Sequence, residues 1–323
     1  MDSVVDVLIA GGGPAGLTAA LTLARQLHTA VVFDNKSYRN ANVSHMHMIP
    51  TWDHRDPAQF RAEARDEVFH HYDTIKIEDV DLKTAEKTSD GLFQLIDAND
   101  KVWKGRKLII TTGSENIFPD IPGYAEAWGQ RIYHCLFCKG YEDRSTESAG
   151  VLAIQSIGNI PMAMHHTESA AQLARKVTIY TNGAEELGAQ IFTTLTDKDK
   201  TRFTVNNTPI KKLTHTRSSI HLELADGTTK EETFLVHSPN TTVKGPLASQ
   251  LGLELTPMGD INAAPPMHQT SVRGVFAAGD CITPYKVIAG AISSGCNAAV
   301  AASAQLLAEK YGHQRCSRCL AVS

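Results

Sequence analysis

A glycine-rich turn near the start of the chain constrains its fold more than any other feature. An apolar strand pattern covers residues 4–10, the sequence Gly-Gly-Gly-Pro-Ala-Gly follows at 11–16, and apolar residues then recur at helical spacing. A second apolar strand, residues 30–33, ends in Asp34, about 20 residues beyond the glycines. This order predicts a strand, turn, helix and strand of the type that binds a dinucleotide.

Each glycine of this turn has a different role in such a site. Gly11 allows a tight turn, Gly13 lets a pyrophosphate approach the backbone, and Gly16 lets the helix pack closely on the strand. The helix N-terminus offers N–H groups to anionic oxygens, and Asp34 is placed to accept hydrogen bonds from an adenosine ribose. A glycine turn without a ligand is the competing interpretation, which the agreement of strand, helix, acid and spacing disfavours.

Two later segments favour a flavin nucleotide, FAD, as the cofactor. Thr111-Thr112-Gly113 closes a buried strand that begins at Lys107, and residues 274–280 repeat the strand-then-turn pattern near the end of the chain. The predicted cofactor-binding residues are Gly11, Gly13, Pro14, Ala15, Gly16, Asp34, Thr112, Gly113, Gly279 and Asp280.

The strand and turn signals predict an α/β fold with two domains, the first of them discontinuous. Residues 1–122 and 252–323 are expected to form the FAD-binding, Rossmann-like domain, and residues 123–251 an inserted α/β domain. Pro122-Gly123 punctuates the chain at the first boundary. An Ala-rich helix is expected over Ile288–Tyr311.

Cysteine usage points to redox or metal chemistry. Six cysteines in 323 residues are too few for a secreted disulfide scaffold, and four of them form two Cys-x-x-Cys pairs, Cys135/Cys138 and Cys316/Cys319. Two cysteines at this spacing at the start of a helix can close a small disulfide ring, and the helix end lowers the pKa of the attacking thiol. Half of a zinc site is the competing interpretation of the first pair, with the second pair as the other half.

Net charge and hydropathy limit the binding partners and the cell compartment that can be expected. The net charge is −4 with Lys and Arg scattered, which does not suggest nucleic-acid binding. The N-terminus has no signal-peptide pattern, and no apolar run reaches the roughly 18 residues that a membrane helix requires. We therefore expect a cytoplasmic protein that does not bind membranes and acts on a small or thiol-bearing partner.

These motifs, in this order over nearly the whole chain, resemble the low-molecular-weight thioredoxin reductase family. Residues 48–57 (Met-Ile-Pro-Thr-Trp-Asp-His-Arg-Asp-Pro) and 134–142 (His-Cys-Leu-Phe-Cys-Lys-Gly-Tyr-Glu) look like the gliotoxin-type fungal dithiol oxidases, which close disulfides in epidithiodiketopiperazines. The resemblance implies a homodimer with a two-domain thioredoxin reductase-like fold. It also implies that Asp280 binds the ribityl chain of FAD, that Cys138 faces the flavin, and that Cys135 exchanges with the substrate.

The residue after the second cysteine departs from the resemblance. Gliotoxin-type enzymes carry His there and the reductases carry Asp, whereas this chain has Lys139. Because a Lys acts as an acid or base near neutral pH only when its pKa is lowered, either His134 takes that role or the pKa of Lys139 is shifted. Glu142 is a third candidate, and a solvated surface group is the alternative for each.

The inserted domain lacks the fingerprint that NADPH binding requires. Its first strand, residues 151–154, is followed by Gln-Ser-Ile-Gly-Asn-Ile-Pro, with one glycine where three are needed. The next strand, residues 177–180, ends in Thr-Asn-Gly, which supplies neither an Arg for a 2′-phosphate nor an acid for a ribose. We expect NADPH binding to have been lost, so that electrons enter from a small dithiol and leave to dioxygen, yielding hydrogen peroxide.

Other interpretations stay open at this point. The function could be that of an NADPH-dependent disulfide reductase with a drifted site, of a reductase supplied by an iron–sulfur protein such as ferredoxin, or of a non-catalytic flavin-binding partner. Cys281 and Cys296 are expected to be buried thiols. Residues 45–48 are expected to line the substrate pocket or simply to pack. No other His, Cys or acid cluster has metal-ligand spacing, so no metal is predicted.

Overall fold

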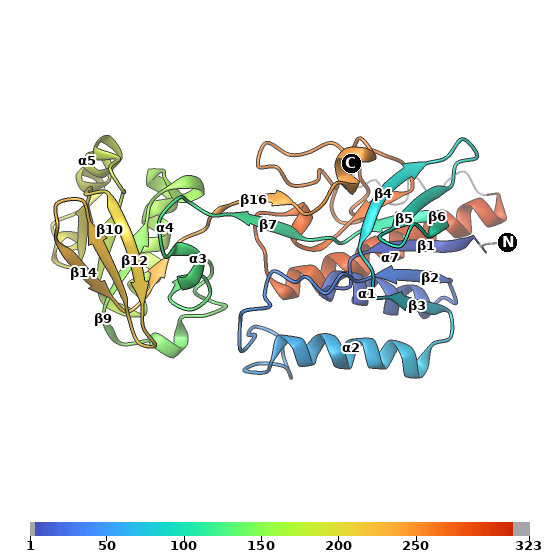
Figure 1. Ribbon diagram of the computed structural model, residues 1–323, viewed down its shortest axis with the longest axis horizontal. Coiled ribbons are helices and arrows are strands. Elements are labelled where there is room, and N and C mark those ends of the chain that lie inside the picture. Colours follow the sequence, from blue (N-terminus) through green and yellow to red (C-terminus); the bar gives the residue numbers. More distant parts are fainter. Residues whose placement is uncertain (1–3, 313–323) are drawn as a thin grey trace. The chain divides into compact units, whose positions relative to one another are not determined.

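The computed structural model describes residues 4–312, which fold into two units (Figure 1). The first unit contains the residues up to 115 and those from 241 onward, and the second contains residues 116–240. The predicted α/β architecture, with a discontinuous first domain and an inserted second one, is confirmed. The pair Cys316/Cys319 lies outside the described residues.

The boundaries of the units differ from the predicted ones at 122/123 and 251/252. The chain passes between the units at 115/116 and 240/241, where β7 (Ser114–Ile117) pairs with β16 (Asn240–Val243). Ile121 packs in a core of the inserted unit, and Leu247 packs in a core of the first unit. Pro122 therefore belongs to the start of the inserted unit and does not mark its edge.

A seven-stranded sheet forms the centre of the first unit. Its order is β3-β2-β1-β6-β5-β4, and β17 pairs with the C-terminal part of β6. The strands are β1 (Val5–Ala10), β2 (Ala30–Phe33), β3 (Ile75–Glu78), β4 (Leu82–Lys87), β5 (Phe93–Asp97), β6 (Val102–Ile110) and β17 (Val275–Ala277). β1, β2, β3, β6 and β17 pair in parallel, whereas β4 and β5 add antiparallel pairs. The parallel pairing brings the carboxyl ends of β1, β6 and β17 to one edge of the sheet.

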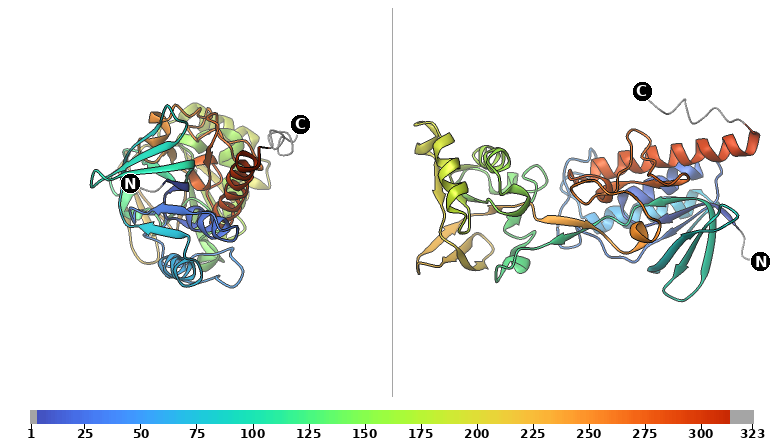
Figure 2. Two further views of the ribbon diagram at one scale, coloured as in Figure 1. Left: turned by 90° about the vertical axis from the view of Figure 1, so that its right-hand side faces the viewer. Right: turned by 90° about the horizontal axis from the view of Figure 1, so that it is seen from above.

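Helices cover this sheet because its side chains alternate between two apolar cores. Val7 and Ile9 of β1 belong to one core, and Leu8 and Ala10 belong to the other. The helices of this unit are α1 (Pro14–Ala24), α2 (Pro57–His71), α6 (Leu247–Gln250) and α7 (Ile288–Tyr311). α1 and α7 pack side by side in the first core, as Figure 2 shows.

The Ala-rich helix expected over Ile288–Tyr311 is confirmed as α7 with the same bounds, although no apolar segment of membrane-spanning length was expected from the sequence. Among the described residues, it is the one helix long and apolar enough to cross a membrane, and half of its apolar window is buried inside the protein. A Cβ added at Gly295 would lie 2.2 Å from the carbonyl oxygen of Ala15, so the two helices approach very closely there. Packing against α1 accounts for the apolar character of α7.

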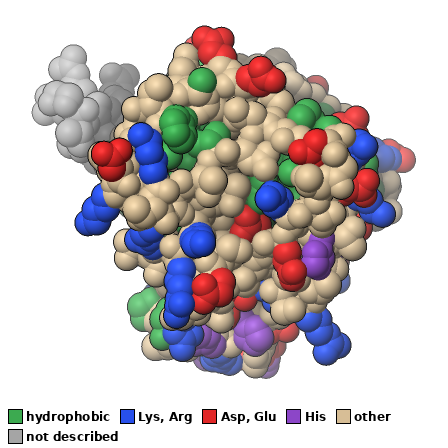
Figure 3. Space-filling view, turned by 90° about the vertical axis from the view of Figure 1, so that its left-hand side faces the viewer, with side chains coloured by type: hydrophobic (Ala, Val, Ile, Leu, Met, Phe, Trp, Pro, Cys, Tyr) green, Lys and Arg blue, Asp and Glu red, His purple; other side chains and the backbone are tan. Residues whose placement is uncertain are grey.

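The inserted unit contains a parallel sheet of order β11-β10-β9-β15-β8 and an antiparallel sheet of order β12-β13-β14. The strands are β8 (Ile132–Tyr133), β9 (Thr146–Leu152), β10 (Ala174–Tyr180), β11 (Phe203–Asn206), β12 (Ile210–His215), β13 (Ile220–Leu224), β14 (Thr229–Glu232) and β15 (Leu235–Val236). The helices are α3 (Tyr124–Ala127), α4 (Ile160–Ala170) and α5 (Glu185–Thr194). On the face shown in Figure 3, basic and acidic side chains are interspersed, and this view shows no continuous basic surface.

Candidate redox and cofactor site

The glycine turn between β1 and α1 is held tightly on one side and open on the other. A Cβ at Gly11 would lie 2.2 Å from the carbonyl oxygen of Thr111, and a Cβ at Gly16 would lie 1.9 Å from that of Gly11. At Gly13, by contrast, an added Cβ meets no heavy atom within 4 Å. The turn is therefore packed where strand and helix meet and leaves space beside Gly13, as a pyrophosphate would require.

The start of α1 provides hydrogen-bond donors to that space. Gly13 caps the helix without a side-chain hydrogen bond, and Pro14 occupies its first turn. The first N–H groups of a helix have no partner within the helix, so those of Ala15 and Gly16 are available to an anion. No acidic side chain lies in this first turn.

Residues at the end of β6 have the properties of a cofactor contact. Thr111 Oγ1 donates to the carbonyl oxygens of Ala10 and Gly11, at 3.0 and 2.9 Å. Thr112 Oγ1, in contrast, is buried without a hydrogen-bond partner in the described part of the protein. Gly113 has a φ of 77° and open space where a Cβ would be. Since a buried hydroxyl without a partner is costly, Thr112 fits a site completed by a polar ligand such as FAD.

Asp34 lies at the end of β2, as predicted, and its carboxylate is already engaged by the protein. It is 1% exposed, and it accepts hydrogen bonds from Tyr38 Oη at 2.6 Å, Arg65 Nη1 at 2.8 Å and the backbone N–H of Lys36 at 2.9 Å. A carboxylate has about four acceptor positions, so roughly one is left for a ribose hydroxyl. The part of Asp34 in ribose binding stays a prediction.

Tyr38 and Arg65 were not identified from the sequence. Arg65 also donates to Asp79 at 2.7 Å and so links α2 to the loop after β3. Burial, together with the hydrogen bond to Asp34, raises the pKa of Tyr38 above its usual value. The phenol therefore keeps its proton and acts as a donor to Asp34.

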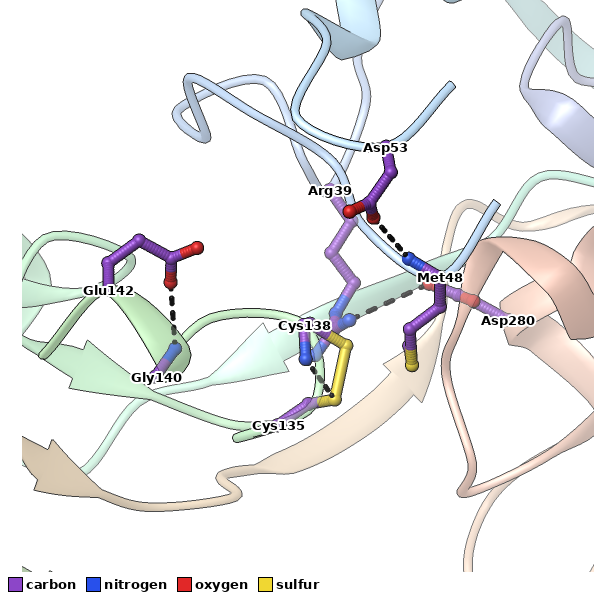
Figure 4. The surroundings of a disulfide bond; sticks show 8 residues. All are labelled: Arg39, Met48, Asp53, Cys135, Cys138, Gly140, Glu142 and Asp280. Atoms are coloured by element: carbon purple, nitrogen blue, oxygen red, sulfur yellow. Dashed lines mark hydrogen bonds and ion pairs between the residues drawn. A yellow bond between two sulfur atoms is a disulfide. The ribbon is translucent and has the colours of Figure 1, made fainter. Parts of the chain in front are cut away.

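Asp280 follows β17 on the short helical turn Gly279–Ile282, at the same sheet edge as the glycine turn. Arg39 Nη1 lies 3.7 Å from Asp280 Oδ2 (Figure 4). Burial lowers the pKa of Arg39, and the carboxylate of Asp280 opposes that shift. The sequence pattern indicated Asp280 but gave no signal for Arg39, which lies more than 240 residues away in the chain.

The predicted redox pair is present as a disulfide between Cys135 and Cys138 (Figure 4). Their Cα atoms lie 5.2 Å apart, and the backbone N–H of Cys138 donates to Cys135 Sγ at 3.1 Å. The pair was expected at the start of a helix, and this is wrong. Residues 134–140 form a turn after β8, with a single helical turn of hydrogen bonds onto the carbonyl oxygen of Cys135.

The two ends of this turn are tied together by a polar cluster. Arg131 Nη1 and Tyr133 Oη both bond the carboxylate of Asp143, each at 2.7 Å. Arg131 and Tyr133 precede the cysteines, and Asp143 follows them in the short helix Tyr141–Asp143. These bonds hold the two ends of the disulfide turn together, although no longer helix follows the cysteines.

The three candidate proton carriers take different positions around the turn. Lys139 Nζ donates to the carbonyl oxygen of Gly129 at 2.8 Å and lies 5.0 Å from the ring centre of Tyr133. Burial lowers the pKa of Lys139, and Arg131 lowers it further. The His134 ring stacks on Trp128, with centroids 5.8 Å apart.

Glu142 is exposed, and its Oε2 accepts from the backbone N–H of Gly140 at 3.2 Å (Figure 4). The carboxylate is thereby held against the turn that it follows. The hydrogen bond of Lys139 to Gly129 connects the turn to a backbone carbonyl outside it.

The loop after β9, where a nucleotide fingerprint would lie, is filled by its own side chains. Gln155 donates to the carbonyl oxygen of Ile117 at 3.1 Å and accepts from the N–H of Asn240 at 3.3 Å. Asn159 Oδ1 accepts from the N–H of Met162 at 3.1 Å and so caps α4. The donors that a pyrophosphate would use at this helix start are thus already partly satisfied.

The side chains at the end of β10 are likewise hydrogen-bonded to other residues of the inserted unit. Thr181 Oγ1 donates to Asn207 Oδ1 at 2.9 Å, and Asn182 Oδ1 accepts from the N–H of Ile210 at 2.7 Å. These contacts connect β10 to the neighbouring strands, and neither residue offers the charge that a ribose or a 2′-phosphate would require.

The remaining described cysteines differ from each other. Cys281 is fully buried, as expected, and burial raises the pKa of its thiol to about 12. Its Sγ donates to the carbonyl oxygen of Ala278 at 3.2 Å. Cys296 was also expected to be buried, but it is only half-buried on α7.

The chain is similar to known oxidoreductases over nearly its whole length. The family model described as pyridine nucleotide-disulphide oxidoreductase matches residues 5–305. The chain is 48% identical to the thioredoxin reductase aclD of Aspergillus oryzae, over 93% of this chain and 96% of the relative. It is 44% identical to the thioredoxin reductase tcpT of Claviceps purpurea, over 97% of both chains. Among solved structures, an oxidoreductase from Agrobacterium tumefaciens matches with a TM-score of 0.84 and 31% identity, over 94% of this chain and 99% of that one.

Proposed function

Since the chain belongs to the pyridine nucleotide-disulphide oxidoreductase family, as a thioredoxin reductase-like flavoprotein with FAD as its cofactor, we propose that it is a dithiol oxidase. The substrate would be a small molecule with two thiols, of the epidithiodiketopiperazine type, and the product its cyclic disulfide. The resemblance of residues 48–57 and 134–142 to gliotoxin-type enzymes supports this substrate class.

The filled loop after β9 carries the proposal. A reductase of this architecture takes its electrons from a pyridine nucleotide bound in the inserted unit. Here Asn159 caps α4 itself, and Gln155 bonds Ile117 and Asn240 in the space after the strand. Because these side chains already use hydrogen-bonding groups that a pyrophosphate would need, the dithiol substrate is the simplest source of electrons in this proposal.

The protein's own disulfide would take those electrons by thiol–disulfide exchange. One substrate thiolate attacks Cys135 Sγ, the bond between Cys135 and Cys138 breaks, and a mixed disulfide forms. The second substrate thiolate then attacks the substrate sulfur of that bond, so the cyclic disulfide leaves and both cysteines are reduced. His134, Lys139 and Glu142 are the candidates to receive the protons of the substrate thiols.

FAD, when bound, supplies the step that accepts two electrons from the cysteine pair and transfers them to dioxygen. The overall reaction is dithiol plus dioxygen to cyclic disulfide plus hydrogen peroxide, in which two electrons and two protons balance. In the proposed form the enzyme is cytoplasmic and a homodimer, of which the resemblance implies the dimer.

Anaerobic reduction of the flavin tests the proposal directly. A reduced diketopiperazine dithiol should bleach the flavin absorbance, and NADPH should not. In air, the same dithiol should consume oxygen and release hydrogen peroxide in equal amounts. The variants Cys135→Ser and Cys138→Ser should bind FAD normally and lose this turnover. Rapid bleaching of the flavin by NADPH would contradict the oxidase proposal and indicate a reductase.

A reductase is the second candidate, and the names of the relatives favour it, because aclD and tcpT are both called thioredoxin reductases. In that case NADPH or ferredoxin would supply electrons, and Cys135 and Cys138 would reduce a disulfide partner. Oxygen uptake with the dithiol alone, in the absence of both electron donors, separates the oxidase from this alternative.

A further inference from the structure

The loop that leads from β2 to α2 contains a cluster of side chains that the proposed reaction does not use. The loop is closed by an antiparallel bridge between Met46 and Arg55. The N–H of Met46 donates to the carbonyl oxygen of Arg55 at 2.8 Å, and the N–H of His54 donates to that of Met46 at 3.0 Å. This closure brings residues from the two ends of the loop together.

Two imidazoles and a carboxylate meet inside the loop. His47 Nδ1 lies 3.3 Å from Asp53 Oδ1, and His54 Nε2 lies 3.3 Å from Asp53 Oδ2. The two rings are in edge contact, with centroids 4.5 Å apart. One ligand atom from each residue lies within 4.8 Å of the other two. The donor set is therefore two nitrogens and one carboxylate, which is typical of a zinc site.

The distances at Asp53 are compatible with a shared cation. Hydrogen bonds between a charged nitrogen and a carboxylate are usually about 2.7–2.9 Å long. Ligand atoms bound about 2.0–2.1 Å from a tetrahedral zinc ion are separated by roughly 3.3 Å, the length of a tetrahedral edge. Both nitrogen–oxygen distances at Asp53 have this value, but they end on different carboxylate oxygens, so a shared ion would bind both oxygens of Asp53 or require its carboxylate to turn.

The cationic side chains near Asp53 do not neutralise its carboxylate, so the carboxylate can bind a metal ion. The N–H of Met48 donates to Asp53 Oδ1 at 3.0 Å and fixes the side chain (Figure 4). In residues 4–312, the ion pairs of Asp53 are with the two histidines, and none is with Lys or Arg. The nearby Arg55 guanidinium lies over the Trp52 ring and pairs with Glu63 instead.

The exposure of the cluster suits a site with an open coordination position. The His47 side chain is 12% exposed, whereas those of Asp53 and His54 are 51% and 62% exposed. One side of the cluster is thus closed by the protein, and the other faces solvent. A cation held there by three protein ligands would keep a water molecule as the fourth.

We propose that His47, Asp53 and His54 bind a divalent transition-metal ion, with Zn²⁺ as the best match to the donor set. No metal was predicted from the sequence, since ligands at 47, 53 and 54 follow none of the usual spacings. The closure between Met46 and Arg55 is what brings them together.

Isothermal titration of the full-length, FAD-bound protein with Zn²⁺ tests this proposal. Thiolates also bind zinc, so the protein is kept oxidised and carries Cys316→Ser and Cys319→Ser. We expect one zinc ion per chain. His54→Ala and Asp53→Asn should each weaken binding at least tenfold, while the flavin spectrum stays unchanged.

His70→Ala is the matched control, because His70 Nδ1 also lies 3.3 Å from a carboxylate, that of Asp66, but no third ligand from residues 4–312 joins them. This variant should bind zinc like the parent. Zinc should also raise the melting temperature of the parent and of His70→Ala, and not that of His54→Ala. The absence of saturable binding, or an equal loss in His54→Ala and His70→Ala, would overturn the proposal.

Discussion

Lys286 and Asp260 form a buried ion pair in the first unit, with Lys286 Nζ 3.0 Å from Asp260 Oδ1 and the two side chains 4% and 5% exposed. The same ammonium donates to the carbonyl oxygens of Asp280 and Thr283, both at 2.7 Å. It also lies 3.1 Å from Ser114 Oγ. Lys286 therefore fixes the backbone of the turn that presents Asp280, the predicted ribityl contact of FAD.

Replacing Lys286 by Met should destabilise the protein and weaken FAD binding together. The change leaves Asp260 buried without its cation, and breaking a buried pair from one side costs about 3–5 kcal/mol. Denaturant unfolding measures the loss, and the flavin-to-protein absorbance ratio measures the occupancy. Lys83→Met is the matched control, because Lys83 pairs with Asp100 at 2.8 Å on the exposed surface and should cost less than about 1 kcal/mol. Equal effects of the two variants would contradict the role of Lys286.

Replacing Gly13 by Ala should weaken FAD binding and leave the stability of the apoprotein nearly unchanged. Gly13 has a φ of −76°, which any residue can adopt, and an added Cβ meets no protein atom. The apoprotein should therefore stay within about 1 kcal/mol of the parent in unfolding free energy. The methyl group would occupy the space that a pyrophosphate needs, so FAD affinity should fall at least tenfold in a fluorescence titration.

Gly16→Ala provides the contrast, since its Cβ would lie 1.9 Å from the carbonyl oxygen of Gly11. This variant should lose both stability and FAD. Unaltered FAD affinity in Gly13→Ala would place the pyrophosphate elsewhere.

The sequence predicted the fold and the glycine turn because both are encoded by local patterns. The apolar runs of β1 and β2 identify buried strands wherever they pack, and the glycines define their turn by backbone geometry alone. The nature of the Cys135 and Cys138 turn was not predictable in this way. Its closure depends on Asp143 bonding back to Arg131 and Tyr133, which side-chain spacing does not reveal.

Long-range polar partners were missed for a related reason. Lys286 pairs with Asp260 across 26 residues, and Arg39 lies beside Asp280 only because β2 and β17 belong to one sheet. No local pattern in the sequence around these residues indicates such partners. The unit boundary at 115/116 differs from the predicted 122/123 for a similar reason, because Pro122 signals a turn but not the core in which Ile121 packs.

Removing the cap of α4 should affect stability and not turnover. Asn159 Oδ1 accepts from the N–H of Met162, so Asn159→Ala should lower the unfolding free energy by about 1 kcal/mol. Dithiol oxidation should continue at the parent rate, since the loop after β9 binds no electron donor in the proposed reaction. Reduction of the flavin by NADPH in the parent, abolished by this variant, would show instead that the loop is a working nucleotide site.

Acid should destabilise the inserted unit through His237. This side chain is fully buried, its Nδ1 lies 2.5 Å from Tyr124 Oη, and burial lowers its pKa to about 4. An unfolded histidine has a pKa of about 6.5, so between these values the unfolded state binds more protons and stability falls as the pH falls. The loss should approach about 3 kcal/mol by pH 4 and then level off.

Unfolding free energies measured from pH 8 to pH 4 check this expectation. His237→Gln should have lower stability at neutral pH and a flatter decline below pH 6.5 than the parent. The exposed His45 serves as the control, and His45→Gln should keep the parent's slope. Parallel curves for the parent and His237→Gln would assign the acid sensitivity to other groups.

His134, rather than Lys139, should control the pH dependence of dithiol oxidation. Lys139 Nζ donates to the carbonyl oxygen of Gly129, a contact that holds its proton on the nitrogen and fixes the start of the turn. His134 directly precedes Cys135 and is oriented by its stacking on Trp128. We therefore expect His134→Gln to reduce kcat about 100-fold with little change in stability. Lys139→Met should instead lower stability and raise KM while the shape of the pH profile is kept. If Lys139→Met abolished the pH dependence and His134→Gln did not, the amine would be the proton carrier, and its lowered pKa would then serve the reaction itself.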